Sequence, residues 1–193
     1  MGTEAIGYVI GQQCAPVLAG IKPSNLLIVE KGNQASLRHV LRGTGLLRHL
    51  LYTSREKDYW FLFEPDSFWE LLHNPEKERY LRDCGYVTDS LEAVLSKLTD
   101  RFGSYKRGGG AFPHEIGVLL GYPLGDVKGF IENAGQNFKM SGYWKVYDDV
   151  AYAGKVFALY EQVKKAVLEL CTQGMGIRDI RNRLLEAGIP AAT

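Results

Sequence analysis

Residues 46–64, LLRHLLYTSREKDYWFLFE, decide the fold class of this chain. Two runs rich in apolar and aromatic residues, 46–53 and 59–64, flank the polar segment 54–58. This pattern is typical of an antiparallel β-hairpin, because strands favour β-branched and aromatic residues whereas the turn between them is polar. We therefore expect a hairpin here, within a small antiparallel sheet.

Two further strands and a series of helices are predicted around this hairpin. Residues 25–30, NLLIVE, form a short apolar run, and residues 143–147, YWKVY, alternate as a strand does. After Pro65 the apolar spacing becomes helical, most clearly in 90–102 and 177–187. The predicted fold class is therefore α+β: a small, mostly antiparallel sheet covered by helices, with a helical C-terminal half, its strands at about 25–30, 46–53, 59–64 and 143–147.

Proline and glycine are expected to interrupt the helices. Residues 3–13 predict a helix that leads to Pro16, where a break or a new helix start follows because proline lacks an N–H. Pro123 likewise separates two short predicted helices, 113–120 and a second that begins at residue 124 or 126 and ends at 133. Gly121 is expected to end the first of these in a left-handed conformation.

The 193 residues predict a single α+β domain, with residues 171–193 as a candidate helical appendage. A chain of this length buries roughly 70% of its unfolded surface, so its core needs no covalent or metal staple. The three cysteines, Cys14, Cys84 and Cys171, form no CxxC pair. This spacing argues against a disulfide framework and a cysteine-rich zinc site, and it predicts a reducing, cytoplasmic location.

Charge and hydropathy argue against two classes of partner. The chain carries 23 Lys and Arg against 22 Asp and Glu, a net charge of +1, which lacks the basic excess of a dedicated nucleic-acid binder. No apolar run reaches the length of a membrane span, and Glu4 with Gln12 and Gln13 interrupts the opening segment. We therefore expect no membrane association and no signal peptide.

Glycine is concentrated in one part of the chain, since 10 of the 22 glycines lie between Gly103 and Gly142. Gly117 and Gly129 fall inside predicted helices, where each costs about 1 kcal/mol relative to alanine. Such a cost indicates either close backbone packing or room left for a ligand. The stretch is therefore the first place to look for a functional site.

Five sequence blocks resemble the bacterial family catalogued as domain of unknown function 3793. They are CAPVLAG (14–20), FPHEIG (112–117), LGYP (120–123), DVKGFIEN (126–133) and GYWKVY (142–147). The resemblance covers about residues 5–170 and implies no activity, cofactor or partner. It does imply that certain positions belong to a shared pattern, namely Cys14, His114, Glu115, Asp126, Asn133, Tyr143, Trp144 and Lys145.

The leading functional prediction is a small-molecule or regulatory module that binds a small anionic ligand. The glycines of residues 106–110, KRGGG, can turn their N–H groups toward an anion. The start of the helix that follows adds partial positive charge. The loop has neither the GK[ST] of a Walker A motif nor a GxGxxG pattern after a strand, so it specifies no nucleotide and no cofactor. A solvated flexible loop is the simpler interpretation of residues 106–110. The predicted ligand-binding residues are Lys106, Arg107, Gly108, Gly109, Gly110, His114, Glu115, Tyr143 and Lys145.

A thiol-dependent hydrolase or transferase is the first alternative. Cys14 would be the nucleophile, His114 its base, and Asp126 or Asn133 the group that orients the imidazole. A buried structural cysteine explains Cys14 as well. No metal site is predicted, because no HExxH or equivalent spacing of ligands occurs.

A helix-turn-helix regulator is the second alternative. Residues 115–131 have its pattern of two short helices around Gly121, and residues 167–184 have a similar one with Arg178, Arg181 and Arg183. A recognition helix presents cations and amides to DNA, whereas the second helix of the first pattern is nearly neutral. Helical hairpins packed on a sheet would explain both patterns, so nucleic-acid binding is disfavoured.

Overall fold

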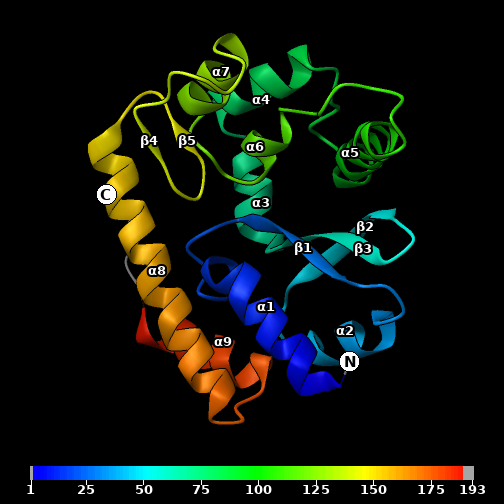
Figure 1. The fold of residues 1–193 in the computed structure, drawn as a ribbon, viewed down its shortest axis with the longest axis vertical. Coiled ribbons are helices and arrows are strands. Elements are labelled where there is room, and N and C mark those ends of the chain that lie inside the picture. Colours follow the sequence, from blue (N-terminus) through cyan, green and yellow to red (C-terminus); the bar gives the residue numbers. More distant parts are fainter. Residues whose placement is uncertain (1, 189–193) are drawn as a thin grey trace. The chain divides into compact units, whose positions relative to one another are not determined.

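A computed structural model of the protein describes residues 2–188 and has the predicted α+β fold class (Figure 1). These residues divide into two compact units, which we call the sheet unit (2–68 with 162–188) and the helical unit (69–161). Helices α3 (Pro65–Leu72) and α8 (Val150–Thr172) each contribute residues to both units. Among the described helices, none has the length and hydropathy needed to cross a bilayer.

The sheet unit contains a three-stranded antiparallel sheet in the order β1 (Ser24–Glu30), β3 (Lys57–Phe63) and β2 (Leu47–Thr53). The hairpin predicted from residues 46–64 is therefore confirmed, with β3 as the central strand. Its turn is closed by Ser54, whose N–H donates to the Lys57 carbonyl at 2.8 Å. The register places Trp60 opposite Leu27 on one side and Leu50 on the other.

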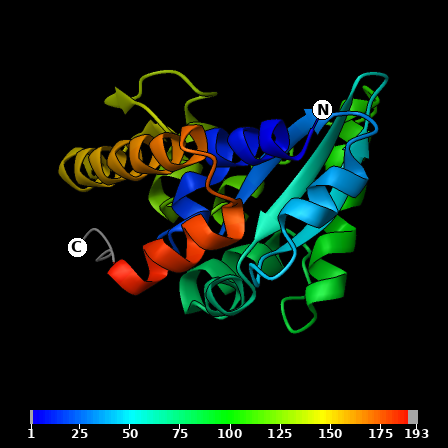
Figure 2. The same cartoon turned by 90° about the horizontal axis from the view of Figure 1, so that it is seen from below.

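Helix α1 (Thr3–Leu18) packs on β1, and also contacts α2 (Gln34–Val40) and α9 (Ile177–Ala187) (Figure 2). The side-chain amide of Gln13 bonds both the N–H and the carbonyl of Ile28, each at 2.9 Å. The predicted interruption appears as a kink at Cys14 (φ −125°, ψ 16°). The helix resumes because Pro16 fits the first turn of a new helix, although it has no N–H to donate.

Helix α9 is attached to the sheet unit through Arg181, which is buried. Its guanidinium donates to the carbonyls of Val17 and Leu18 at 2.9 and 3.2 Å and to that of Thr44 at 2.7 Å. The last carbonyls of a helix lack partners within the helix and attract positive charge. Arg181 therefore satisfies the end of α1 from a helix far away in the sequence.

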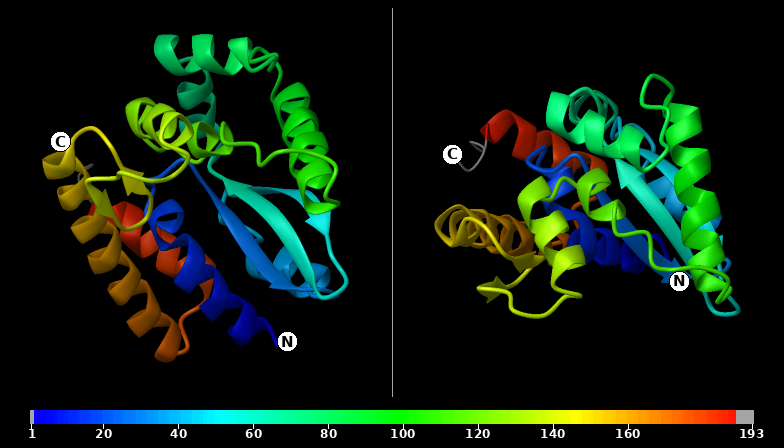
Figure 3. Two further views of the ribbon diagram at one scale, coloured as in Figure 1. Left: turned by 45° about the horizontal axis from the view of Figure 1, so that its top comes forward. Right: turned by 90° about the horizontal axis from the view of Figure 1, so that it is seen from above.

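After the last residues of α3, the helical unit continues with two capped helices, α4 (Pro75–Asp83) and α5 (Leu91–Lys106) (Figure 3). Asn74 and Ser90 accept hydrogen bonds from the first turns of these helices, as N-cap residues do. The remaining elements are α6 (Ile116–Leu119), α7 (Leu124–Glu132), β4 (Met140–Ser141) and β5 (Lys145–Val146). Helix α7 packs against both α6 and β5.

The predicted strand 143–147 does not join the main sheet. Only Lys145–Val146 is a strand, and it pairs with Met140–Ser141 in a separate two-stranded sheet. The reason is competition for backbone donors from a residue distant in the sequence, because the N–H groups of Tyr147 and Asp148 bond the Asp126 carboxylate at 2.7 and 2.9 Å. Those groups are therefore not available to a neighbouring strand.

The predicted helix 113–120 is also shorter in the structure, where α6 covers only Ile116–Leu119. The N–H groups of Ile116 and Gly117 bond carbonyls three residues earlier, each at 3.0 Å, which makes a tight turn rather than an α-helix. Gly121 follows with φ +83°, the left-handed conformation expected at this position. The two-helix arrangement around Pro123 is thus confirmed with a shortened first helix.

Candidate functional site

A pocket of about 430 Å³ lies within the helical unit, in the glycine-rich part of the chain. Segments 112–130 and 141–145 line it, and its apolar surface includes Ile116, Leu120 and Val127. Phe112, Ser141 and Gly142 are exposed, so the pocket is open to solvent beside them. The volume lies within the range of about 300–1,000 Å³ that is typical of small-molecule sites.

Aromatic rings form much of the pocket wall. The His114 ring lies between Phe112 and Phe130, with centroid distances of 5.2 Å to each. Tyr122 stacks on Trp144 at 5.2 Å with an interplanar angle of 29°. Rings at these distances and angles hold one another in place, so the wall is preformed for a flat ligand.

Asp126 fixes the position of Trp144. The indole Nε1 donates to Oδ2 of Asp126 at 2.6 Å, while Oδ1 accepts the two backbone N–H bonds of Tyr147 and Asp148. Asp126 is buried in the first turn of α7, where the helix dipole favours a negative charge. These three hydrogen bonds hold the carboxylate against Trp144 and the backbone, so they fix its position in the pocket wall.

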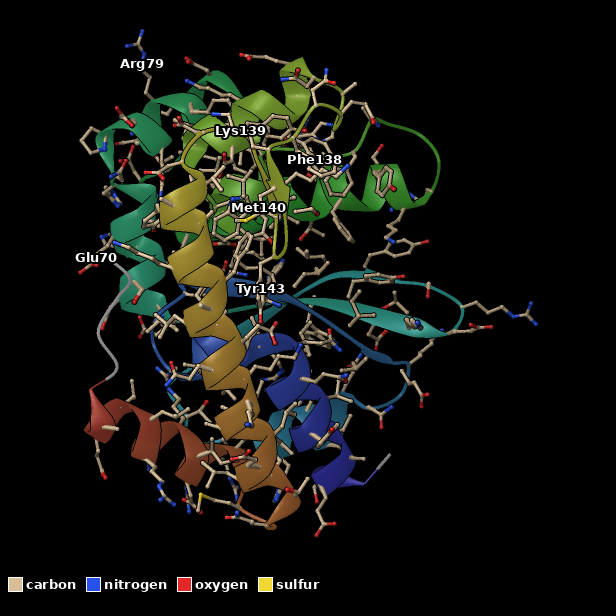
Figure 4. All side chains as sticks on the ribbon, turned by 60° about the vertical axis from the view of Figure 1, so that its left-hand side comes forward. Glu70, Arg79, Phe138, Lys139, Met140 and Tyr143 are labelled. Atoms are coloured by element: carbon tan, nitrogen blue, oxygen red, sulfur yellow. The ribbon has the colours of Figure 1, made fainter. Side chains whose placement is uncertain are left out.

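Lys145 places a positive charge beside these rings. Its Nζ donates to the Gly135 carbonyl at 2.6 Å and lies 4.7 Å from the Phe138 ring centroid and 5.7 Å from that of Phe130. No carboxylate among residues 2–188 forms an ion pair with Lys145. An ammonium has three donors, so further hydrogen-bonding capacity remains. Phe138 and the neighbouring Lys139, Met140 and Tyr143 are labelled in Figure 4.

His114 is half-buried in the pocket wall. Within the described part of the chain, neither nitrogen of its imidazole has a hydrogen-bond partner; the ring contacts are those with Phe112 and Phe130. The ring is only half-buried, and its nitrogens are not among the fully buried polar atoms that lack a partner in the described residues. The imidazole is therefore available to a molecule that enters the pocket.

Two other predicted ligand residues lie in structural interactions instead. Glu115 is buried and ion-paired with Arg101, whose Nη2 is 3.1 Å from Oε2, and it accepts a hydrogen bond from Tyr86 at 3.1 Å. Burial and this carboxylate raise the pKa of Tyr86. Tyr143 donates to Glu161 at 2.8 Å and packs against Tyr160. Neither Glu115 nor Tyr143 lines the pocket.

The predicted glycine loop does not line the pocket either. Gly108, Gly109 and Gly110 are exposed and follow the end of α5, where the N–H of Gly109 donates to the Ser104 carbonyl at 3.0 Å. Lys106 lies over the Phe102 ring at 5.6 Å, and Arg107 is the C-cap of α5. Of the predicted residues, the structure thus brings together His114, Asp126 and Lys145 in the pocket.

The predicted nucleophile, Cys14, is fully buried in the sheet unit, whereas His114 belongs to the helical unit. Burial raises the pKa of the Cys14 thiol to about 12, although Lys22 and Asn25 beside it oppose this shift. Reactive cysteines normally have lowered pKa values, because the thiolate is the nucleophile. Asn133 bonds the Gly129 carbonyl at 2.9 Å, at the end of α7. The thiol hypothesis remains a prediction.

The residues that sequence reasoning missed are the aromatic walls. Phe112, Tyr122, Phe130 and Trp144 were not chosen as site residues, although all lie in or beside the glycine-rich stretch. The available signal was this concentration of aromatic residues around a proline and several glycines. Between residues 2 and 188, no group of three or more His, Cys, Asp or Glu side chains is placed to hold a bare metal ion.

Comparison with known proteins gives one match. A family model described as protein of unknown function (DUF3793) matches residues 10–181. The matched region includes every residue that lines the pocket. Neither the curated proteins nor the solved structures include a match to this chain. Function must therefore be argued from the geometry of the pocket.

Proposed function

The chain belongs to the DUF3793 family, and we propose that it is a ligand-binding protein whose pocket takes a small planar aromatic molecule bearing an acidic group. The observation that carries this proposal is the composition of the pocket wall. Its surface is aromatic and aliphatic, and the basic side chains in it are those of His114 and Lys145. Few convergent polar groups in an apolar pocket are typical of small-molecule sites.

The aromatic walls favour a flat ligand. Stacked and edge-on ring contacts are most favourable between planar groups, and they add to the hydrophobic gain from burying the ligand. The wall already holds such pairs, Phe112 with His114 and Tyr122 with Trp144. A planar ring system can add a further stacked or edge-on contact to these pairs.

The charges in the pocket favour an acidic ligand. Lys145 has no carboxylate partner among the described residues, whereas the Asp126 carboxylate is held by three hydrogen bonds to Trp144 and the backbone. Charges interact more strongly where the surroundings are less polar than water, as between the rings of Phe130 and Phe138. A carboxylate, sulfonate or phosphate on the ligand would pair with Lys145.

Anilinonaphthalene sulfonate, a planar aromatic anion, provides a direct test, with the uncharged N-phenylnaphthylamine as its matched probe. We expect saturable binding of the sulfonate, followed by its fluorescence. Lys145→Met should weaken that binding about tenfold, because one charge-assisted interaction is lost. The same variant should bind the uncharged probe as the unchanged protein does.

Lys165→Met is the control, since Lys165 is exposed on α8 and does not line the pocket. It should bind both probes normally. Circular dichroism of each variant verifies the fold, because anilinonaphthalene sulfonate also binds partly unfolded chains. Binding that does not saturate, or that falls equally in both lysine variants, would contradict the proposal.

A further inference from the structure

We infer that the ligand of this pocket is an iron porphyrin, coordinated at the iron by His114 and paired through a propionate with Lys145. This inference rests on the proposed function and narrows it to one chemical class. It begins with the imidazole of His114, which is held between the Phe112 and Phe130 rings without a hydrogen-bond partner in residues 2–188. Imidazole nitrogen is the commonest metal ligand in proteins.

A metal bound by His114 would have to bring its other ligands with it. Bare metal ions are held by several protein side chains, and the described residues provide no such group. The nearby carboxylate of Asp126 is occupied by Trp144 and two backbone N–H groups. In a porphyrin, four ring nitrogens complete the equatorial plane, so that one imidazole suffices as the protein ligand.

The shape of the pocket agrees with a macrocycle. Porphyrin is a large, flat, apolar ring system, and the rings of Phe112, Phe130 and Trp144 belong to the pocket wall, Trp144 being packed also against Tyr122. One side of the pocket is open, since Phe112 is 37% exposed and Ser141 is also exposed. A flat ligand larger than the enclosed volume can therefore enter edge-on and keep part of its rim in water.

The positive charge of Lys145 is complementary to the carboxylates on the porphyrin rim. Propionates are carboxylates, and Lys145 is the cation of the pocket wall. Its Nζ can bond a propionate while it keeps the bond to the Gly135 carbonyl, because an ammonium has three donors. Binding to ferric porphyrin is a ligand exchange: an imidazole nitrogen donates its lone pair to iron in place of a bound water, the other nitrogen keeps its proton, and no electron is transferred.

The test is a titration of the purified protein with hemin, followed by the Soret band. We expect saturable binding and a spectrum of imidazole-ligated ferric haem. His114→Ala should lose this spectrum, and added imidazole should restore it by occupying the vacated position. His39→Ala is the control, because His39 is exposed in α2 of the sheet unit and should leave the spectrum unchanged. Lys145→Met should weaken hemin binding about tenfold and keep the band position.

Metal-free protoporphyrin IX and anilinonaphthalene sulfonate separate this inference from the proposed function. If these probes bind while hemin gives the same spectrum with the unchanged protein and with His114→Ala, the iron site is refuted and the aromatic-anion pocket stands. If the sulfonate binds and neither porphyrin does, the iron site is again refuted and the aromatic-anion pocket again stands. If none of the three binds to folded protein, both proposals fail.

Discussion

At the scale of single residues, Asp126 is the charged group that fixes the pocket wall in place. One carboxylate receives the indole N–H of Trp144 and the backbone N–H groups of Tyr147 and Asp148. It thereby joins the first turn of α7 to the segment that carries Lys145. To orient a catalytic imidazole, this carboxylate would have to give up one or more of these hydrogen bonds. The bonds themselves explain Asp126 as a structural residue.

Asp126→Asn should therefore destabilise the protein by about 2 kcal/mol. The amide carries no charge, and its NH2 group would face one of the three N–H groups that now donate to the carboxylate. Urea unfolding measures this change. Asp100→Asn, an exposed substitution on α5, is the matched control and should change stability by less than about 0.5 kcal/mol. An equal loss in the two variants would show that the Asp126 network contributes nothing particular.

At the scale of elements, glycine explains how α7 approaches the segment after β5. A Cβ at Gly129 would lie 2.6 Å from both Cβ and Cγ of Tyr147, far inside van der Waals contact. Gly117 is similar, because its Cβ would lie 2.9 Å from Val127 Cγ2. Close backbone packing therefore accounts for both helical glycines.

Gly129→Ala should destabilise the protein by about 1–3 kcal/mol, because the overpacking cost exceeds the gain of about 1 kcal/mol in helix propensity. Gly154→Ala isolates that gain, since Gly154 lies in α8 and a Cβ there would meet nothing within 4 Å. Thermal unfolding should therefore shift in opposite directions for the two variants. A stabilised Gly129→Ala protein would refute the close approach.

The elements also show where sequence patterns suffice. The hairpin 46–64 and helix α5 follow from apolar spacing and caps that act over a few residues. Both are present, although α5 ends at Lys106 and not at residue 102 as predicted. The strand 143–147 was placed in the wrong sheet, because its local pattern is that of any strand. Its pairing depends on Asp126, a residue distant in the sequence that binds the N–H groups of Tyr147 and Asp148.

At the scale of the whole molecule, one buried cation links stability to pH. Lys22 is 3% exposed in the sheet unit, where its ammonium bonds Asn25, and burial lowers its pKa from 10.5 to about 8. Between pH 8 and 10.5 the unfolded chain therefore binds more protons at this residue than the folded chain does. The contribution of Lys22 to stability consequently rises with pH across that window.

Lys22→Met removes this dependence. The stability of the variant relative to the unchanged protein should be highest near pH 7 and should fall by roughly 3 kcal/mol as the pH approaches 10.5. Denaturant unfolding at several pH values measures the difference. The raised pKa of Cys14 acts in the opposite direction above pH 9, and losing the Lys22 charge raises that pKa further. Below about pH 12 the folded thiol is protonated in both proteins, so its contribution is nearly the same in each across this window. Lys165→Met should show a constant difference, and a constant difference for Lys22→Met would contradict the argument.

The sequence by itself determined the α+β class, the hairpin, most of the helices and the family, because apolar periodicity, prolines and glycines act on neighbouring residues. It also located the glycine-rich stretch in which the pocket lies. Only the tertiary structure decided that His114 and Lys145 meet in one wall whereas residues 108–110 lie outside it. The physical reason is that packing between distant segments sets the direction of each side chain. Here that packing depends on the hydrogen bonds of Asp126 and on the absence of a side chain at Gly129.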